Sequence, residues 1–178
     1  AQRALQGWAG RNRYIACSIG TKFQVNDWGN QNWEELLKRL SLKYTDYGLI
    51  MLGADDEFSR SEELCRSWAG HSLNLCGKVS PRCAAAVIKG AHIFLGHDSG
   101  PMHLAAAFNI PCVVIFSARN KPGIWFPYGS SHYVIYHKTE CFGCGLAVCK
   151  IYKKKCINSI TATEVFDCFC KAADRLKL

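Results

Sequence analysis

Short apolar runs alternate with amphipathic segments along most of this chain. The apolar runs are continuous, which is typical of strands buried on both faces of a parallel sheet. They predict six strands, at residues 14–19, 48–53, 73–76, 93–96, 111–117 and 132–137. Strands that alternate with helices in this way indicate one α/β domain over residues 1–178, with a Rossmann-like, doubly wound sheet.

Helix signals occupy the segments between these strands. Asn32, with Glu35 three residues later, predicts a capping box at the start of the first helix. Thr161 and Glu164 predict a second capping box, which opens a closing helix over residues 161–176. The remaining helices are predicted at 58–69, from Ser80-Pro81 to Gly90, and at 101–108.

The predicted sheet also indicates where a ligand would bind. Doubly wound sheets bind ligands beyond the carboxyl ends of their strands. We therefore expect the site in the loops that follow Ile19, Gly53, Gly96 and Phe116.

Composition narrows the class of protein and of partner. Hydrophobic residues make up 49% of the 178 and charged residues 20%, which suits a packed core. No run reaches the roughly 20 apolar residues of a membrane span, and the first residues do not resemble a signal peptide. We therefore expect a soluble cytoplasmic protein.

The formal net charge of +8 favours anionic partners. The basic run from Lys150 to Lys155 is also typical of a solvated loop. No nucleic acid is expected as a partner, because aromatic and basic residues do not interleave as they do on base-stacking surfaces.

The stretch 96–116, GHDSGPMHLAAAFNIPCVVIF, contains the strongest candidate for a binding site. A polar turn separates a predicted strand from a helix, rich in small residues, that begins near Pro101. Ser99 and Gly100 would leave free backbone N–H groups at the positive end of that helix, where a diphosphate could bind. The alternative is an ordinary strand–helix connection in which Asp98 caps the helix.

The run from Asp98 to Ala107, DSGPMHLAAA, resembles the signature of the lipopolysaccharide heptosyltransferase family, glycosyltransferase family 9. Residues 18–33 are similar to that family's first strand, phosphate loop and tryptophan-containing helix entry. Residues 53–57, GADDE, resemble its turn after the second strand. The resemblance extends over roughly residues 14–176 and adds to the residue-based prediction of a parallel α/β sheet.

The resemblance implies a GT-B glycosyltransferase, in which two Rossmann-like domains enclose the active site. This chain is similar to the C-terminal domain, which binds the nucleotide-sugar. The N-terminal domain, which binds the acceptor and supplies the general base, is expected to be absent, so the chain alone would bind donor without turnover. The implied reaction inverts the anomeric centre without a metal cofactor.

The same resemblance implies the substrates and the location. The donor would be ADP-heptose, and the acceptor, bound through the missing domain, a glycolipid of the lipopolysaccharide type. The protein would be cytoplasmic, with peripheral contact at the inner membrane.

Donor-binding roles follow from the resemblance, residue by residue. Asp98, Ser99 and Gly100 would face the diphosphate and the sugar, whose hydroxyls could donate to the Asp98 carboxylate. His103 could stabilise the leaving diphosphate, although a lone histidine there is more often a surface or core residue. No other residue of this chain is expected to take part in the chemistry.

Three further residues are assigned to the donor. Thr21 and Lys22 follow the first strand and could hold phosphate, and Glu57 follows the second and could accept both ribose hydroxyls. Lys22 is equally typical of a solvated lysine, and Glu57 of a helix start. The sequence departs from the family at Asn26, where many members carry a phosphate-binding lysine, and Lys22 is the candidate to compensate.

Four of the eleven cysteines gather in the segment 141–156. Cys141, Cys144, Cys149 and Cys156 resemble a pattern seen in many family members. C-x2-C spacing can bind a structural zinc or, less often, an iron–sulfur cluster. Reduced structural thiols are the favoured alternative in a reducing compartment. A bound metal would fix the loop and take no part in transfer.

Two hypotheses from other classes remain. One is a non-catalytic Rossmann-like module that binds a nucleotide or phosphate for another protein. The other is an interaction domain organised by a metal at the cysteines.

Overall fold

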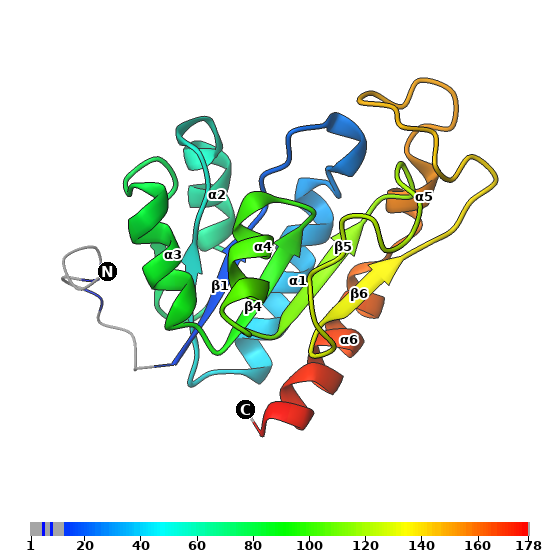
Figure 1. The fold of residues 1–178 in the computed structure, drawn as a ribbon. Helices are drawn as coiled ribbons and strands as arrows, with labels where there is room; N and C mark the ends of the chain where they lie inside the picture. The colour runs from blue at the N-terminus through cyan, green and yellow to red at the C-terminus, as the bar shows by residue number, and fades with distance from the viewer. Residues whose placement is uncertain (1–4, 6–7, 9–12, 178) are drawn as a thin grey trace.

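A six-stranded parallel sheet forms the centre of the molecule in the computed structural model, which describes residues 5, 8 and 13–177. Its strand order is β3-β2-β1-β4-β5-β6, and every neighbouring pair is parallel (Figure 1). The strands are β1 (Tyr14–Ser18), β2 (Gly48–Met51), β3 (Ser72–Asn74), β4 (Ile93–His97), β5 (Cys112–Phe116) and β6 (Tyr133–Tyr136). This order confirms the predicted Rossmann-like fold. The outermost residues of the predicted 1–178 domain lie outside the described part.

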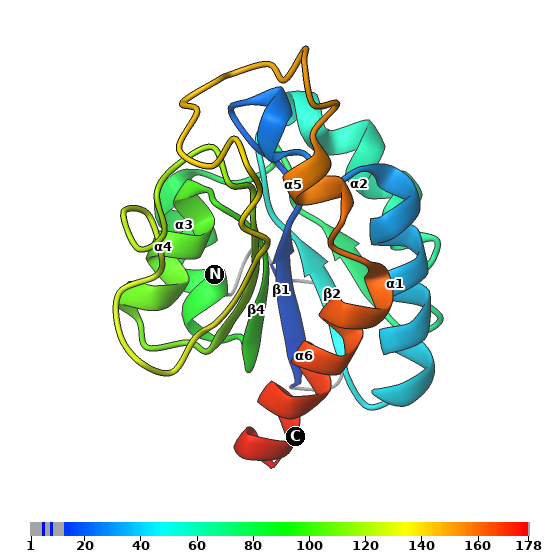
Figure 2. The same cartoon turned by 90° about the vertical axis from the view of Figure 1, so that its right-hand side faces the viewer.

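Helices cover both faces of the sheet (Figure 2). One face carries four of them, and the other carries two. The first group is α1 (Asn30–Lys43), α2 (Phe58–Cys65), α5 (Lys155–Asn158) and α6 (Ala162–Leu176), and the second is α3 (Pro81–Lys89) and α4 (Gly100–Ala107). Two short 3-10 helices, η1 (Gln24–Asn26) and η2 (Asp55–Glu57), lie in loops that follow strands.

Alternate residues of each central strand point into the two layers. In β1, Ile15 and Cys17 join the core beneath α1 and α6, whereas Ala16 joins the core beneath α3 and α4. All five residues of β1 are buried, and the same holds for β4 and β5. Burial on both sides explains why these strands have continuous apolar sequences.

Two of the predicted helix starts are confirmed, with one difference in detail. Ser80 caps α3, and Thr161 caps α6 by accepting a hydrogen bond from the Glu164 N–H at 3.2 Å. The Glu164 carboxylate does not complete the capping box, because it contacts the His137 ring at 2.9 Å. The Glu164 side chain thus contacts His137, in the segment after β6, instead of returning to the backbone of the cap residue Thr161.

Two other helix boundaries were wrong. The first helix begins at Asn30, with Gly29 at the N-cap in a positive-φ conformation (φ 96°), and not after Asn32. The Asn32 amide instead donates to the Trp28 carbonyl at 2.8 Å, so it lies within the first turn. The helix predicted at 58–69 ends at Cys65, because the chain turns there towards β3.

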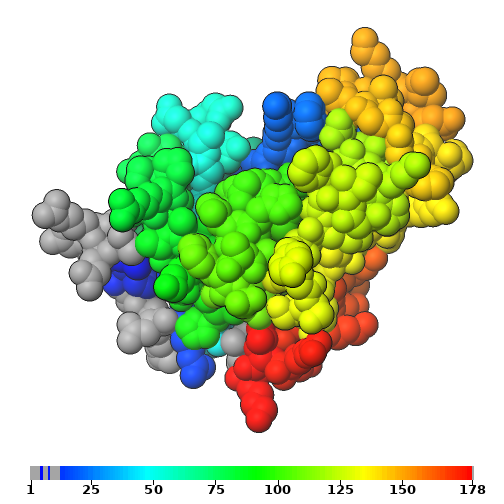
Figure 3. Space-filling model, viewed as in Figure 1, coloured from blue at the N-terminus to red at the C-terminus, as the bar shows by residue number. Residues whose placement is uncertain are grey.

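The segment between β6 and α6 projects from one corner of the molecule (Figure 3, yellow to orange). It follows the carboxyl end of the edge strand β6, so it lies at the same end of the sheet as the loops expected to bind ligand (Figure 1). Among the described helices, none combines the length and apolar character needed to cross a membrane.

Candidate donor-binding site

A cleft of about 850 Å³ opens beyond the carboxyl ends of β1, β2 and β4. It lies where the strand order reverses, with β2 on one side of β1 and β4 on the other. Six of the seven residues predicted to bind donor line it: Thr21, Lys22, Glu57, Asp98, Ser99 and Gly100. The seventh, His103, is not part of its lining. The opposite wall is largely apolar and includes Leu52, Val79, Pro81, Ala84, Ile88 and Leu104.

The amino end of α4 forms the floor of the polar half of this cleft. Ser99 is the N-cap residue, and Pro101 lies in the first turn. The Ser99 carbonyl accepts from the Met102 N–H at 3.1 Å, but its hydroxyl is buried and finds no partner among the described residues. Gly100 is exposed and has open space where a side chain would be. The helix end therefore presents unused donors to an anion.

The Asp98 carboxylate is half-buried at the rim of the same helix end. Burial raises its pKa, and the positive potential of His103 and Arg119 only partly opposes this. Within the described chain no hydrogen bond or ion pair reaches the carboxylate. Because Ser99 occupies the N-cap position, Asp98 is not the helix cap, and a half-buried acid without donors suits a ligand that supplies hydroxyl groups.

Two glycines make room for the Glu57 carboxylate. Gly20 follows β1 and Gly53 follows β2, and a Cβ at either position would overlap the Glu57 carboxylate. One carboxylate oxygen accepts from the Ala54 N–H at 3.2 Å, as expected for a helix start, and burial raises the Glu57 pKa. The second oxygen remains for a ligand, so the helix-start and ligand-binding interpretations are compatible.

Thr21 and Lys22 lie in the loop that follows β1. The Thr21 hydroxyl donates to the Phe23 carbonyl at 2.7 Å and accepts from the Phe23 N–H at 3.2 Å, which fixes the loop. The Lys22 ammonium lies 5.6 Å from the Phe23 ring centre and is exposed. Among the described residues that line the cleft, Lys22 is the only cationic one.

Asn26 does not face the cleft. It is buried, and its amide oxygen accepts a hydrogen bond from the Ser117 hydroxyl after β5. A lysine at this position would have to bury its charge or displace Ser117. Asn26 therefore joins the loop after β1 to the loop after β5 through a side-chain hydrogen bond. The positive charge that the loop after β1 brings to the cleft is that of Lys22.

His97, the last residue of β4, is a functional candidate that sequence reasoning missed. The ring is fully buried against the loop between β1 and α1: Nδ1 donates to the Ile19 carbonyl at 3.0 Å, and Nε2 accepts from the Trp28 N–H at 3.3 Å. Burial lowers its pKa to about 4, so it is neutral near pH 7. His97 therefore connects the loop after β1 to the end of β4, directly before Asp98. No local motif marks such a contact in the sequence.

His103 lies on the outer side of α4. Its ring is exposed and packs edge-on against Trp125 at 6.4 Å between ring centres. Its charge still acts on the nearby Asp98 carboxyl. The structure thus brings His103 close to the site without placing it in the wall.

The four clustered cysteines differ in exposure. Cys144 is exposed, Cys141 and Cys149 are half-buried, and Cys156 is buried in α5 instead of lying in a loop. Burial raises the Cys156 pKa, and the neighbouring Cys141 and Cys149 thiols raise it further. Thiols are suitable donors for zinc or iron. Nevertheless, no three His, Cys, Asp or Glu side chains within the described residues form a group arranged to hold a metal.

Comparisons with known proteins agree with this architecture. The family model described as glycosyltransferase family 9 (heptosyltransferase) matches residues 1–155. Lipopolysaccharide heptosyltransferase 1 of Pseudomonas aeruginosa is 26% identical over 136 residues, which cover 76% of this chain and 37% of that protein.

Two solved structures share the fold at low sequence identity. ADP-heptose lps heptosyltransferase II of E. coli has a TM-score of 0.78 at 19% identity, covering 99% of this chain and 52% of its own. TibC of enterotoxigenic E. coli, an iron-containing heptosyltransferase solved in complex with ADP-D-β-D-heptose, has a TM-score of 0.69 at 19% identity, covering 92% and 46%. The chain therefore spans about half, or less, of the length of these relatives. With its family match over most of the sequence and its parallel Rossmann-like sheet, the chain belongs to glycosyltransferase family 9, the heptosyltransferase family.

Proposed function

We propose that this domain binds the nucleotide-diphosphate-sugar donor of a heptosyltransferase, with ADP-heptose as the donor. The observation that carries the proposal is the unpartnered Asp98 carboxylate beside the open amino end of α4, facing an 850 Å³ cleft. The co-crystallised donor of the TibC relative supports this choice of nucleotide and sugar.

The two halves of the cleft suit the two ends of such a donor. The diphosphate would lie against the N–H groups of Ser99 and Gly100, where the helix dipole favours negative charge. The base would lie against the apolar wall formed by residues such as Val79 and Leu104. Glu57 would accept hydrogen bonds from the ribose, and Asp98 from hydroxyls of the sugar.

The reaction would be a single displacement with inversion. A base from the acceptor side removes the proton of the acceptor hydroxyl, whose oxygen then bonds to the anomeric carbon while the bond to the diphosphate oxygen breaks. ADP leaves with the electron pair of that bond. The α4 amino end would stabilise the growing negative charge on the diphosphate, with support from Lys22 and from His103 when protonated, and no metal would be needed.

A second domain would complete the enzyme. It would supply the general base and bind a glycolipid acceptor of lipopolysaccharide synthesis, so that the donor domain alone binds without turnover. The location would be the cytoplasm, at the inner face of the membrane that holds the acceptor.

The cysteine segment would have a structural role. Its four thiols could take zinc or, as in the iron-containing TibC, iron. Reduced structural thiols are the alternative to a bound metal in a reducing compartment. Fewer than about one metal per four cysteines in reduced protein would exclude a metal-organised interaction domain.

Calorimetric titration with ADP and with ADP-heptose tests the donor proposal. In Asp98→Asn, affinity for ADP-heptose is expected to fall by about tenfold or more, because hydrogen bonds to a charged acceptor are lost. Affinity for ADP should be unchanged or slightly higher, because a negative charge near the diphosphate is removed. Asp167→Asn, on the exposed side of α6, is the matched control.

The same titration separates the alternatives. A nucleotide-binding module for another protein would bind ADP and ADP-heptose equally, with no difference in Asp98→Asn. Absence of binding to either ligand in the wild type would contradict both the donor proposal and that alternative.

A further inference from the structure

The segment from Lys138 to Lys155 exposes apolar side chains to an unusual degree. Ile151 is 76% exposed and Val148 50%, although aliphatic residues normally gain by burial. Three neighbours in the segment are also exposed: Phe142, Leu146 and Tyr152. Contiguous exposed apolar groups of this kind mark interaction sites on soluble domains.

The same segment is strongly basic. It contains five lysines (Lys138, Lys150, Lys153, Lys154 and Lys155) and one acid, Glu140. Lys155 pairs with Glu140 at 3.0 Å, and the Lys154 ammonium donates to the Asp27 carbonyl at 2.8 Å. Lys150 and Lys153 are exposed, and their ammonium groups make no hydrogen bond or ion pair with the described chain. They remain available to an anionic partner.

Backbone contacts hold the segment in place. The Gly143 N–H donates to the Ala118 carbonyl at 2.7 Å, and the Gly145 N–H to the Arg119 carbonyl at 2.8 Å. The Arg119 guanidinium in turn donates to the Gly145 and Leu146 carbonyls at 2.9 and 2.8 Å. The exposed side chains thus lie on a fixed support, and little order has to be gained on binding.

The segment also touches the loop that lines the donor cleft. The Val25 N–H donates to the Ala147 carbonyl at 3.2 Å, and Lys154 reaches Asp27 in the same loop. The protruding corner therefore lies at the same end of the sheet as the loops that line the cleft (Figure 1).

From these observations we propose that residues 142–153 dock this domain on an anionic lipid bilayer. Aliphatic side chains enter the boundary between head groups and acyl chains, while lysines beside them contact the anionic head groups. A nucleic acid fits less well, because bases stack on aromatic rings and the most exposed side chains here are aliphatic. Docking would also turn the donor cleft towards a membrane-bound acceptor, and this statement rests on the proposed function.

Co-sedimentation with vesicles tests the docking surface. The probes are phosphatidylcholine vesicles with and without added phosphatidylglycerol. The wild-type chain should bind only the anionic vesicles, and less as salt is raised. In Lys150→Gln/Lys153→Gln, partitioning should fall by about 30-fold, because each lysine near an anionic surface contributes roughly a fivefold factor. In Val148→Ser/Ile151→Ser, partitioning onto anionic vesicles should also fall by about tenfold or more.

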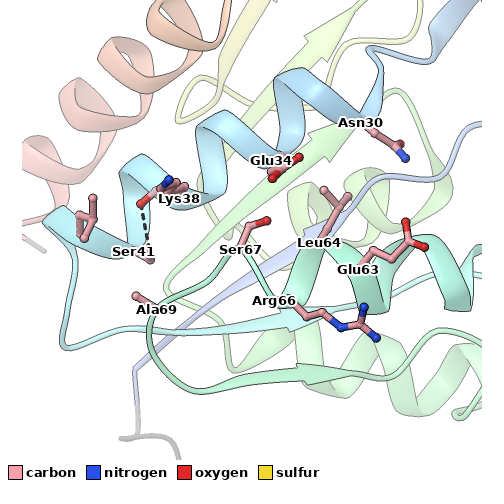
Figure 4. A pocket seen from close by; sticks show the side chains of 10 residues that line it. Asn30, Glu34, Lys38, Ser41, Glu63, Leu64, Arg66, Ser67 and Ala69 are labelled. Carbon is pink, nitrogen blue, oxygen red and sulfur yellow. Dashed lines mark hydrogen bonds between the residues drawn. The ribbon is translucent and has the colours of Figure 1, made fainter.

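Matched controls lie in a different surface groove, between α1 and α2 (Figure 4). Lys38→Gln/Leu42→Ser removes one exposed lysine and one aliphatic side chain, Leu42, that is 67% exposed, and should leave partitioning unchanged. Equal loss in this control, or equal binding to neutral and anionic vesicles, would overturn the proposal.

Other occupants would give different results. If light scattering shows a self-associated wild type that Val148→Ser/Ile151→Ser dissociates, the surface is an interface between copies. If a single-stranded oligonucleotide binds through Lys150 and Lys153 while anionic vesicles do not, the partner is nucleic acid. ADP titration of each variant keeps the two proposals apart, because docking can fail with donor binding intact, and donor binding can fail with docking intact.

Discussion

The donor cleft and the protruding segment 138–155 lie at the same end of the sheet but present positive charge by different means. The cleft has a single cationic side chain in its lining, Lys22, and presents the amino end of α4. The segment has five lysines and exposed aliphatic side chains. A large part of the +8 net charge therefore lies away from the diphosphate site, and the basic character of the chain is not a measure of its affinity for phosphate.

The contrast has a physical cause. Backbone N–H groups at a helix end are fixed and need no side-chain ordering, so they suit a ligand held in one geometry. Flexible lysines on an exposed segment suit a surface whose charges move. Four substitutions or conditions test this difference, beginning with the largest expected effect.

His97→Ala should destabilise the cleft most strongly. The substitution removes a buried ring and leaves the Trp28 N–H and the Ile19 carbonyl without their partner. We expect the free energy of unfolding to fall by about 3–4 kcal/mol. Urea denaturation measures this, with exposed His71→Ala as the control. An effect no larger than that of the control would show that the His97 link is not structural.

Acid should destabilise the domain through the same residue. His97 has a folded-state pKa of about 4, below the unfolded value of 6.5, so the unfolded chain binds the proton first. Its contribution is complete above pH 6.5 and decreases as the pH falls to about 4, by about 3 kcal/mol in total. In His97→Gln, which keeps a donor and an acceptor but does not titrate, the dependence of unfolding on pH over this range should be much weaker. Equal slopes would contradict the assignment.

Gly20→Ala should affect binding more than stability. The new methyl group would overlap the Glu57 carboxylate, which is the end of a flexible side chain and can move. We expect affinity for ADP to fall about tenfold through the lost ribose contact, with a change in stability below about 1 kcal/mol. In a Glu57→Ala background the same substitution should have no further effect on affinity. Additive losses would show that Gly20→Ala does not act through Glu57.

The smallest expected effect distinguishes the lysine of the cleft, Lys22, from a lysine of the segment 138–155, Lys150. Lys22→Gln should weaken ADP binding about threefold at low salt, since an exposed ammonium contributes little in water. Lys150→Gln should leave ADP binding unchanged. A titration in which Lys150→Gln has the larger effect would remove the distinction between the cleft and the segment.

The sequence was sufficient for the sheet and for the loops after the strands, and six of the seven residues predicted to bind donor line the cleft. Apolar runs reveal strands buried on two sides, and the turn at residues 98–101 contains its own helix-start signal. The contacts of His97 with the loop between β1 and α1, and of Asn26 with Ser117, join residues that are 69 to 91 positions apart. No local pattern encodes such pairs, so they appear only in the folded chain.

The ends of α1 and the cysteine segment show the same limit. The capping signal at Asn32 was local and wrong, because the N-cap is the positive-φ Gly29, three residues earlier. The spacing of the cysteines left reduced thiols and a structural metal as alternatives, because spacing alone does not fix how the backbone between Cys144 and Cys156 folds. Cys156 is buried in α5, a helix that the spacing of the cysteines did not predict.

Backbone amide NMR during an ADP titration measures the central claim most directly. If the diphosphate binds at the amino end of α4, the largest shifts should occur at the N–H groups of Ser99 and Gly100, followed by those of Thr21 and Lys22. Shifts centred on residues 150–155, with Ser99 and Gly100 unchanged, would contradict the account.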